Sequence, residues 1–431
     1  MTTEDYRPYL PSPAQSKIAG PNARAHAKTR TDSPRGRATA AARRALVEQT
    51  FTGITTDGAA VTGLFSLAPN GAPAEAMIAA AAALVGCLSP AQRASTCFPV
   101  GDERWRRWQN SELYVEDFGL RLDEVEDRVR DAAMAVVQAS LSAEGFRQSR
   151  DVMRLNRFIG DLVGGPHVLG EWSYLFSLFG APSLDEPWGW QLFGHHLCLH
   201  CLVIGRQMVL TPTFMGAEPS YADTGPFAGI RMFEDEERAG LALMRSLAPA
   251  QQRQAIVAHS MVGGDLPPGR RHPNDNLHLA GAYQDNRIIP YEGIRARDLP
   301  AAQRRQLLDL AARYVAPLPP GPLQARLAEI ERHLAETRFC WIGGFDDSSP
   351  FYYRIQSPVV LIEFDHHAGV FLTNAAPAKF HVHTIVRTPN GNDYGKDLLR
   401  LHYQRAPHHQ SALPEPSGPS KIRSGDERKG P

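Results

Sequence analysis

Two histidine-rich segments lie far apart in this chain, and both alternate polar and apolar residues as β-strands do. The first is Trp188–Cys201, and the second is Tyr353–Arg387. Imidazoles and carboxylates from both segments can form one metal or acid–base site only if their strands belong to the same sheet. The pattern therefore predicts a single sheet that takes strands from the middle and from the end of the chain.

The alternation within the second segment decides which side chains can meet. Residues at i and i+2 of a strand share a face, so His381 and His383 point to the same side. Glu363 and Asp365 share a face of the preceding strand in the same way. If these two strands pair antiparallel, Glu363 or Asp365 lies near the histidines. Two imidazoles with a carboxylate are a normal ligand set for zinc, iron or manganese.

The first segment offers alternative ligands. His196, Cys198 and His200 share one face of the expected strand, and His195 lies on the other. Either His196 or His195 can complete the site, the other holding a hydrogen bond elsewhere. Cys198 and Cys201 have the spacing of a redox pair, but on a strand their sulfurs fall on opposite faces. The predicted metal ligands are His195, His196, Glu363, His381 and His383, and the metal is a divalent ion (Zn, Fe or Mn).

Three further residues are predicted to act in catalysis. Arg354 and Arg387 lie on the site-bearing strands, and a guanidinium matches the shape of a carboxylate, so either arginine can clamp a small-molecule substrate. Their alternative role is an ordinary surface residue or ion pair. Asp365, or the histidine that does not bind metal, can serve as a base.

The rest of the chain predicts an α+β protein with a helical N-terminal part and a mostly antiparallel sheet fed by middle and C-terminal strands. Residues 39–404 are expected to form one domain. Residues 263–297, rich in Pro, Gly, Asp and Asn, predict a long surface loop. No internal repeat is evident. Residues 1–38 and 405–431 have few large apolar side chains and are predicted to be disordered tails.

Composition excludes several classes of partner. The 431 residues include 46 basic and 46 acidic side chains, so nothing indicates nucleic acid or an anionic membrane. No apolar run approaches the length of a membrane span, and the N-terminus does not have the pattern of a secretory signal. Five sparse cysteines favour reduced thiols and a cytoplasmic setting. Oligomeric state is not indicated.

Several blocks of sequence resemble the DUF3500 family, an uncharacterised domain. They are Gly53-Ile-Thr-Thr-Asp-Gly, Gly63-Leu-Phe, Pro187-Trp-Gly-Trp-Gln-Leu-x-Gly-His195-His196-Leu, Leu210-Thr-Pro-Thr-Phe-Met-Gly-Ala-Glu218-Pro, Tyr353-Arg354-Ile, Ile362-Glu363-Phe and His381-Val-His383-Thr-x-x-Arg387. The resemblance covers about residues 45–403 and implies no reaction. It implies that the five predicted metal ligands form one site. The family pattern has an acidic residue at Phe193 and often Asn at His200, which implies an altered pocket and makes His200 a poor ligand.

Three classes of function are consistent with this site. The expected function is a metal-dependent enzyme that acts on a small carboxylate-bearing metabolite by hydrolysis or elimination, the metal polarising a carbonyl or lowering the pKa of bound water. A metal-dependent oxygenase or oxidase using iron, manganese or copper is the first alternative. A non-catalytic binding protein with structural histidines is the second. The sequence does not separate the metals, because their ligand types overlap.

Overall fold

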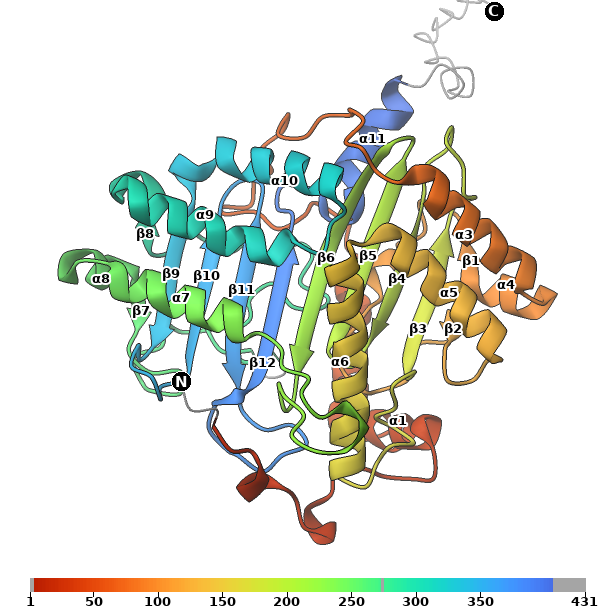
Figure 1. The fold of residues 1–431 in the computed structure, drawn as a ribbon, viewed down its shortest axis with the longest axis horizontal. Helices are drawn as coiled ribbons and strands as arrows, with labels where there is room; N and C mark the ends of the chain where they lie inside the picture. The colour runs from red at the N-terminus through yellow and green to blue at the C-terminus, as the bar shows by residue number, and fades with distance from the viewer. Residues whose placement is uncertain (1–3, 273–274, 406–431) are drawn as a thin grey trace, which may run out of the picture.

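One mixed sheet of twelve strands organises the protein, whose computed structural model describes residues 4–272 and 275–405 (Figure 1). The strands are β1 (Cys97–Phe98), β2 (Leu120–Arg121), β3 (Tyr174–Phe179), β4 (Trp188–Gly194), β5 (Leu197–Ile204), β6 (Gln207–Ala217), β7 (Ile256–Ala258), β8 (Ile294–Arg295), β9 (Arg338–Gly343), β10 (Phe351–Gln356), β11 (Leu361–His367) and β12 (Ala378–Arg387). Their order is β1-β3-β4-β5-β6-β12-β11-β10-β9-β7, with β2 beside β3 and β8 beside β9. All neighbours are antiparallel except β1–β3 and β7–β9. The middle and end of the chain therefore share a sheet, as predicted.

Helices lie mainly across one face of this sheet (Figure 1). The α-helices of the described residues are α1 (Ala23–Thr31), α2 (Pro34–Glu48), α3 (Ala74–Cys87), α4 (Pro90–Thr96), α5 (Asp127–Ser140), α6 (Ala143–Leu162), α7 (Glu234–Ser246), α8 (Pro249–Ala255), α9 (Ala301–Val315), α10 (Pro320–Arg332) and α11 (Lys396–Arg405). None of these helices combines the length and apolar character that crossing a bilayer requires. The α+β class is confirmed, but the helices are not confined to the N-terminal part, because helices precede each set of four strands and α11 follows the second set.

The order of the elements occurs twice along the chain. The first series is α3, α4, β1, β2, α5, α6 and β3–β6, and the second is α7, α8, β7, β8, α9, α10 and β9–β12. In each series the first short strand runs parallel to the first strand of the four-stranded meander, and the second short strand runs antiparallel to it. The two meanders meet where β6 pairs with β12. The structure thus contains an internal repeat that the sequence did not reveal. A short trace of it in the sequence is Leu88-Ser-Pro-Ala-Gln at the start of α4 and Leu247-Ala-Pro-Ala-Gln at the start of α8.

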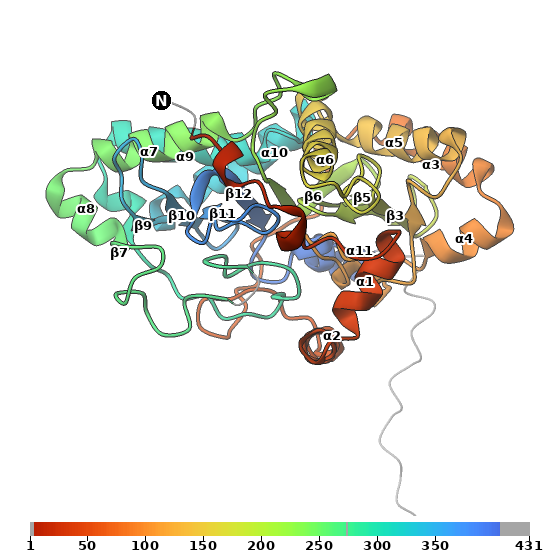
Figure 2. The ribbon, with the colours of Figure 1, turned by 90° about the horizontal axis from the view of Figure 1, so that it is seen from below.

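Long connections, together with α1, α2 and α11, cover the opposite face of the sheet (Figure 2). The segment 263–297 belongs to this cover and is not the surface loop predicted from its composition. Leu277, Ala280 and Ile289 are at most 1% exposed, because they pack onto the sheet. The strands are consequently buried on both faces.

Residues 4–38 form ordered structure, which corrects the predicted N-terminal tail. The segment has no continuous apolar run, and a few buried side chains anchor it to the rest of the protein. Tyr6 is fully buried, with its ring edge-on to Phe158 and Tyr221, and His26 is buried beside Glu112. Of the second predicted tail, residues 406–431 lie outside the described residues, and Arg405 ends α11.

Candidate metal centre

Three histidines from two parts of the sheet come together on the face that the long connections cover. β11 and β12 pair antiparallel with Asp365 opposite His383, as the alternation predicted. β6 lies on the other side of β12, with Gly216 opposite His383. His381 and His383 therefore project from the centre of the sheet.

The third histidine comes from a tight turn. Gly194 pairs with Leu197, so His195 and His196 form the two-residue connection between β4 and β5 and do not belong to a strand. His196 has a φ of 65°, a left-handed conformation that costs a non-glycine residue about 1 kcal/mol or more. Strained backbone of this kind is concentrated at functional sites.

The Nε2 atoms of this His triad (His196, His381 and His383) converge. The Nε2 atom of His383 lies 3.1 Å from that of His196 and 3.1 Å from that of His381. One ligand atom from each residue lies within 4.8 Å of the others. Two nitrogens bound to one tetrahedral zinc ion at roughly 2.0–2.1 Å are about 3.3 Å apart, so the spacing suits a metal ion.

The surroundings of the triad keep its imidazoles neutral. All three side chains are at most 4% exposed. Burial lowers the pKa of each well below its usual range, and the neighbouring imidazoles lower it further. Neutral imidazoles with free lone pairs are the form that binds metal.

Gly216 provides the space that the triad occupies. A Cβ atom at this position would lie 3.0 Å from Cδ2 of His196, 3.0 Å from Cδ2 of His383 and 2.8 Å from the carbonyl oxygen of Val382. Any larger residue at position 216 would displace two members of the triad.

A buried carboxylate fixes the loop that orients His381. The Nδ1 atom of His381 lies 2.9 Å from the carbonyl oxygen of Ala368, an acceptor of the kind that metal-binding histidines use. Glu218 holds this loop by accepting hydrogen bonds from the backbone N–H groups of Val370, Phe371 and Leu372 at 2.8–3.0 Å. Burial raises the pKa of Glu218 to about 7.

His195 lies beside the triad and not in it. Its ring stacks on that of His196 with centroids 3.8 Å apart, and its Nδ1 atom lies 2.7 Å from Oδ1 of Asn156. The amide N–H of Asn156 donates to the carbonyl oxygen of Gly170, so the Oδ1 atom is the acceptor that faces His195. The proton of His195 is therefore assigned to Nδ1 and the lone pair to Nε2. Burial lowers the pKa of His195 to about 4.

The two predicted carboxylates do not join the triad. Glu363 accepts hydrogen bonds from the backbone N–H groups of Leu279 and Ala280 and from the hydroxyl of Tyr352, at 2.6–3.1 Å. The two backbone donors of the 263–297 segment and the Tyr352 hydroxyl of β10 occupy the oxygens that a metal would need. Asp365 lies next to His383 in the sheet, and burial raises the pKa of its carboxyl well above the usual range.

The two predicted substrate-clamping arginines are engaged in buried ion pairs. Arg354 contacts Glu292 at 2.8 Å, and Arg387 contacts Asp285 at 2.6 Å and Asp393 at 2.8 Å. Both guanidinium groups are at most 1% exposed, and neither lines the cavity described below. They attach the covering segments to the sheet.

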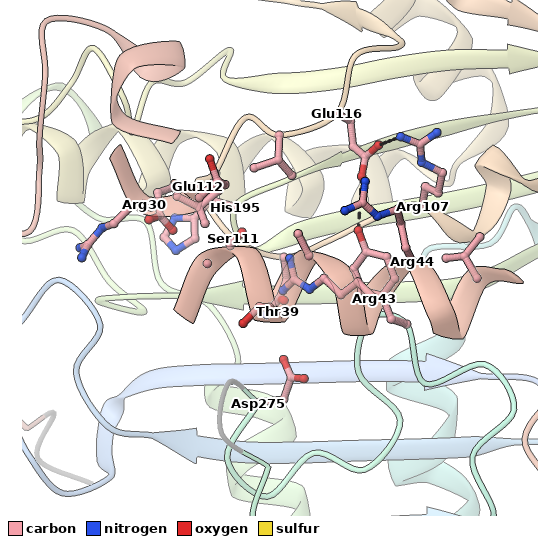
Figure 3. A pocket seen from close by; sticks show the side chains of 18 of the residues that line it. Arg30, Thr39, Arg43, Arg44, Arg107, Ser111, Glu112, Glu116, His195 and Asp275 are labelled. Carbon is pink, nitrogen blue, oxygen red and sulfur yellow. Dashed lines mark hydrogen bonds and ion pairs between the residues drawn. The ribbon is translucent and has the colours of Figure 1, made fainter. Parts of the chain in front are cut away.

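A cavity of about 820 Å³ adjoins the triad. His195, His196 and His383 line it from the sheet, and α2 lines it from the opposite side (Figure 3). The lining residues of α2 include Gly36, Ala40, Arg43 and Val47, whose spacing of three and four places them on one helix face. Sequence reasoning missed this wall, because part of α2 was assigned to a tail.

Sequence reasoning also missed His367, whose ring centroid lies 4.8 Å from that of His381 and 4.4 Å from that of His383. His367 could have been found from the sequence, because it lies two residues after Asp365 and therefore at the spacing of residues that share a strand face. The two cysteines of the redox-spaced pair are buried on opposite faces, Cys198 in one hydrophobic cluster and Cys201 in another. Burial raises the pKa of both thiols, which does not suit redox chemistry.

A family model described as a protein of unknown function (DUF3500) matches residues 70–396. The searches of curated proteins and of solved structures found no match to the chain. The matched range contains the His triad, Gly216 and Glu218, whereas α1 and α2 precede it.

Proposed function

The chain belongs to the DUF3500 family, and we propose that it is a metal-dependent enzyme that acts on a small molecule by hydrolysis or elimination. The His triad is the proposed ligand set for a divalent metal ion. One observation carries the proposal: three buried imidazole nitrogens converge, with 3.1 Å contacts, beside a cavity of about 820 Å³. Catalytic zinc sites typically use three protein ligands and leave one position for water or substrate.

A divalent metal held by three neutral imidazoles acts as a Lewis acid and lowers the pKa of bound water. The side chains around the cavity supply the remaining functions. His195 is held by Asn156 with its Nε2 lone pair available, and it lines the cavity next to His196. We assign to His195 the acceptance of a proton from a molecule bound beside the triad, a role that the sequence predicted for Asp365 or for the histidine that does not bind metal.

Many non-haem iron oxygenases bind their metal with two histidines and one carboxylate. That set is not assembled here, since Glu363 is engaged by backbone N–H groups. Three imidazoles without a carboxylate favour the hydrolytic or eliminating enzyme. A binding protein with structural histidines is the second alternative.

Elemental analysis of the purified protein tests the proposal. We expect about one metal ion per chain, lost in His196→Ala and in His383→Ala. His200→Asn is the matched control, because His200 is a buried histidine on β5 outside the triad. Full metal occupancy in both triad variants would reject the metal centre.

Activity separates the enzyme classes. A panel of small carboxylic esters, amides and hydroxy acids should reveal turnover by the zinc-loaded protein without oxygen. Turnover that requires oxygen and iron would favour the oxygenase. If metal binds and no substrate of the panel is turned over under either condition, the binding protein is favoured.

A further inference from the structure

We propose that Arg43 of α2 binds an anionic group, a carboxylate or a phosphate, of the molecule on which the metal centre acts. The inference rests on the proposed function, which takes the His triad as the metal centre that acts on the substrate. It assigns the anion-binding role that sequence reasoning gave to Arg354 and Arg387, which are committed to ion pairs.

Neutral groups hold the guanidinium of Arg43 at the cavity wall. Its Nη1 atom donates to Oε1 of Gln109 at 2.7 Å, and its Cζ atom lies 4.8 Å from the ring centroid of Tyr283. Gln109 is only 2% exposed, and its own amide N–H donates to the carbonyl oxygen of Leu113, so the orientation of its Oε1 atom is fixed. No carboxylate of the described residues forms an ion pair with Arg43. The Nε and Nη2 atoms, the edge that forms paired hydrogen bonds with carboxylate or phosphate, are left for a ligand.

Among the described residues, none of the acids that line the cavity forms an ion pair with Arg43. Two of the five carboxylates that line the cavity form ion pairs, Glu103 with Arg106 and Lys396 and Glu116 with Arg107. Two others lie beside histidines, Glu112 beside His26 and Asp275 beside His272. The fifth, Glu48, is exposed. Arg35 and Arg44, which also line the cavity, have no carboxylate partner among residues 4–272 and 275–405. The cavity therefore presents an excess of positive charge on its α2 side.

The helix that carries Arg43 is fixed at its nearer end. Arg106, which is 2% exposed, donates to the carbonyl oxygens of Leu46, Val47 and Gln49 at 2.8–3.0 Å. These carbonyls lie at the C-terminal end of α2, about one turn beyond Arg43. Figure 3 shows Arg43 on this helix, which lines the cavity, and His195 among the other lining residues. A guanidinium held in this way loses little freedom when a ligand binds.

The arrangement identifies the class of substrate. One end of the molecule is an anion bound at Arg43, and the other end is the reacting group placed at the His triad. The cavity volume of about 820 Å³ is in the range of sites for small metabolites. Arg43 lies on α2, which precedes the part of the chain that matches the family, whereas Gln109 and Tyr283, which hold its guanidinium, lie within that part.

Calorimetric titration with malonate and with inorganic phosphate at low ionic strength tests the inference. Wild-type protein is compared with Arg43→Gln, with Arg43→Lys and with Arg37→Gln, a control on an exposed residue of the same helix that does not line the cavity. Both metal-loaded and metal-free proteins are titrated, since a bound metal also attracts anions.

We expect Arg43→Gln to weaken binding of at least one probe tenfold or more in both forms, Arg43→Lys to weaken it by a smaller factor, and Arg37→Gln to leave it unchanged. The probe with the larger loss distinguishes a carboxylate from a phosphate substrate. Failure of the wild-type protein to bind either probe, or equal binding by Arg43→Gln, overturns the inference. If Arg43→Gln does not fold, equal binding by Arg43→Lys and wild type overturns it as well. Metal content is expected to stay unchanged in all Arg43 variants, so loss of the anion site leaves the proposed metal centre standing.

Discussion

Replacing Gly216 with alanine adds one methyl group beside the His triad, and we expect this change to weaken metal binding. Ordinary van der Waals contacts of a Cβ atom begin at about 3.4 Å, whereas this one would lie 3.0 Å from both His196 and His383 and 2.8 Å from the Val382 carbonyl oxygen. Each neighbour must therefore move by several tenths of an ångström. Overpacking of this kind costs about 1–3 kcal/mol of unfolding free energy. Disturbing the groups that orient metal ligands typically weakens metal affinity about 10–100-fold.

The two effects can be measured separately. Chelator competition gives the metal Kd, and urea unfolding with and without metal gives the stability. A 10–100-fold loss of affinity removes about 1.4–2.7 kcal/mol of the stabilisation by metal. Gly86→Ala is the control, because its Cβ would meet nothing within 4 Å. In α3 that change should stabilise the protein by about 0.5–1 kcal/mol. Unchanged metal affinity in Gly216→Ala would refute the assignment of the triad.

Three other predictions follow from buried groups. Glu218→Gln should weaken metal affinity about tenfold by releasing the loop that orients His381, and unaltered affinity in chelator competition would exclude this positioning role. Burial lowers the pKa of His200 to about 3, so this imidazole is neutral in the folded protein and takes up a proton in the unfolded protein below about pH 6.5. The contribution of His200 to the free energy of unfolding is therefore complete above pH 6.5 and falls by about 2.7 kcal/mol by pH 4.5. His200→Asn should flatten the pH dependence of the free energy measured by urea unfolding, and parallel pH curves for variant and wild type would contradict this prediction. Arg387→Ala should cost about 3–5 kcal/mol, because it leaves Asp285 and Asp393 buried without their partner, and a loss below 1 kcal/mol in urea unfolding would count against that account.

Strand pairing was predictable from sequence where local alternation decides it. The i, i+2 spacing of His381 and His383, and of Glu363 and Asp365, carries the period of a strand, and β11 and β12 pair as expected. The turn at His195 was not predictable in this way. Its two residues are both histidines, and neither is the glycine, asparagine or aspartate that usually marks a two-residue hairpin turn, so the connection looks like uninterrupted strand.

The remaining errors come from contacts between residues distant in sequence. Glu363 accepts hydrogen bonds from backbone N–H groups more than eighty residues earlier in the chain, and no local sequence pattern predicts that contact. The N-terminal segment lacks apolar periodicity, yet Tyr6 anchors it by filling a pocket among aromatic rings. A composition-based prediction of disorder does not detect single anchors of this type.

The His triad takes its residues from both halves of the internal repeat. His196 belongs to the first meander, and His381 and His383 belong to the second, so the triad crosses the seam at which β6 joins β12. In a homodimer this seam would be the subunit interface. Neither half carries a complete set of ligands, so a metal ion bound by the triad would connect the two halves. Binding of a metal ion by the triad would therefore be thermodynamically linked to the association of the two halves: separating the halves would release the ion, and the bound ion would oppose their separation.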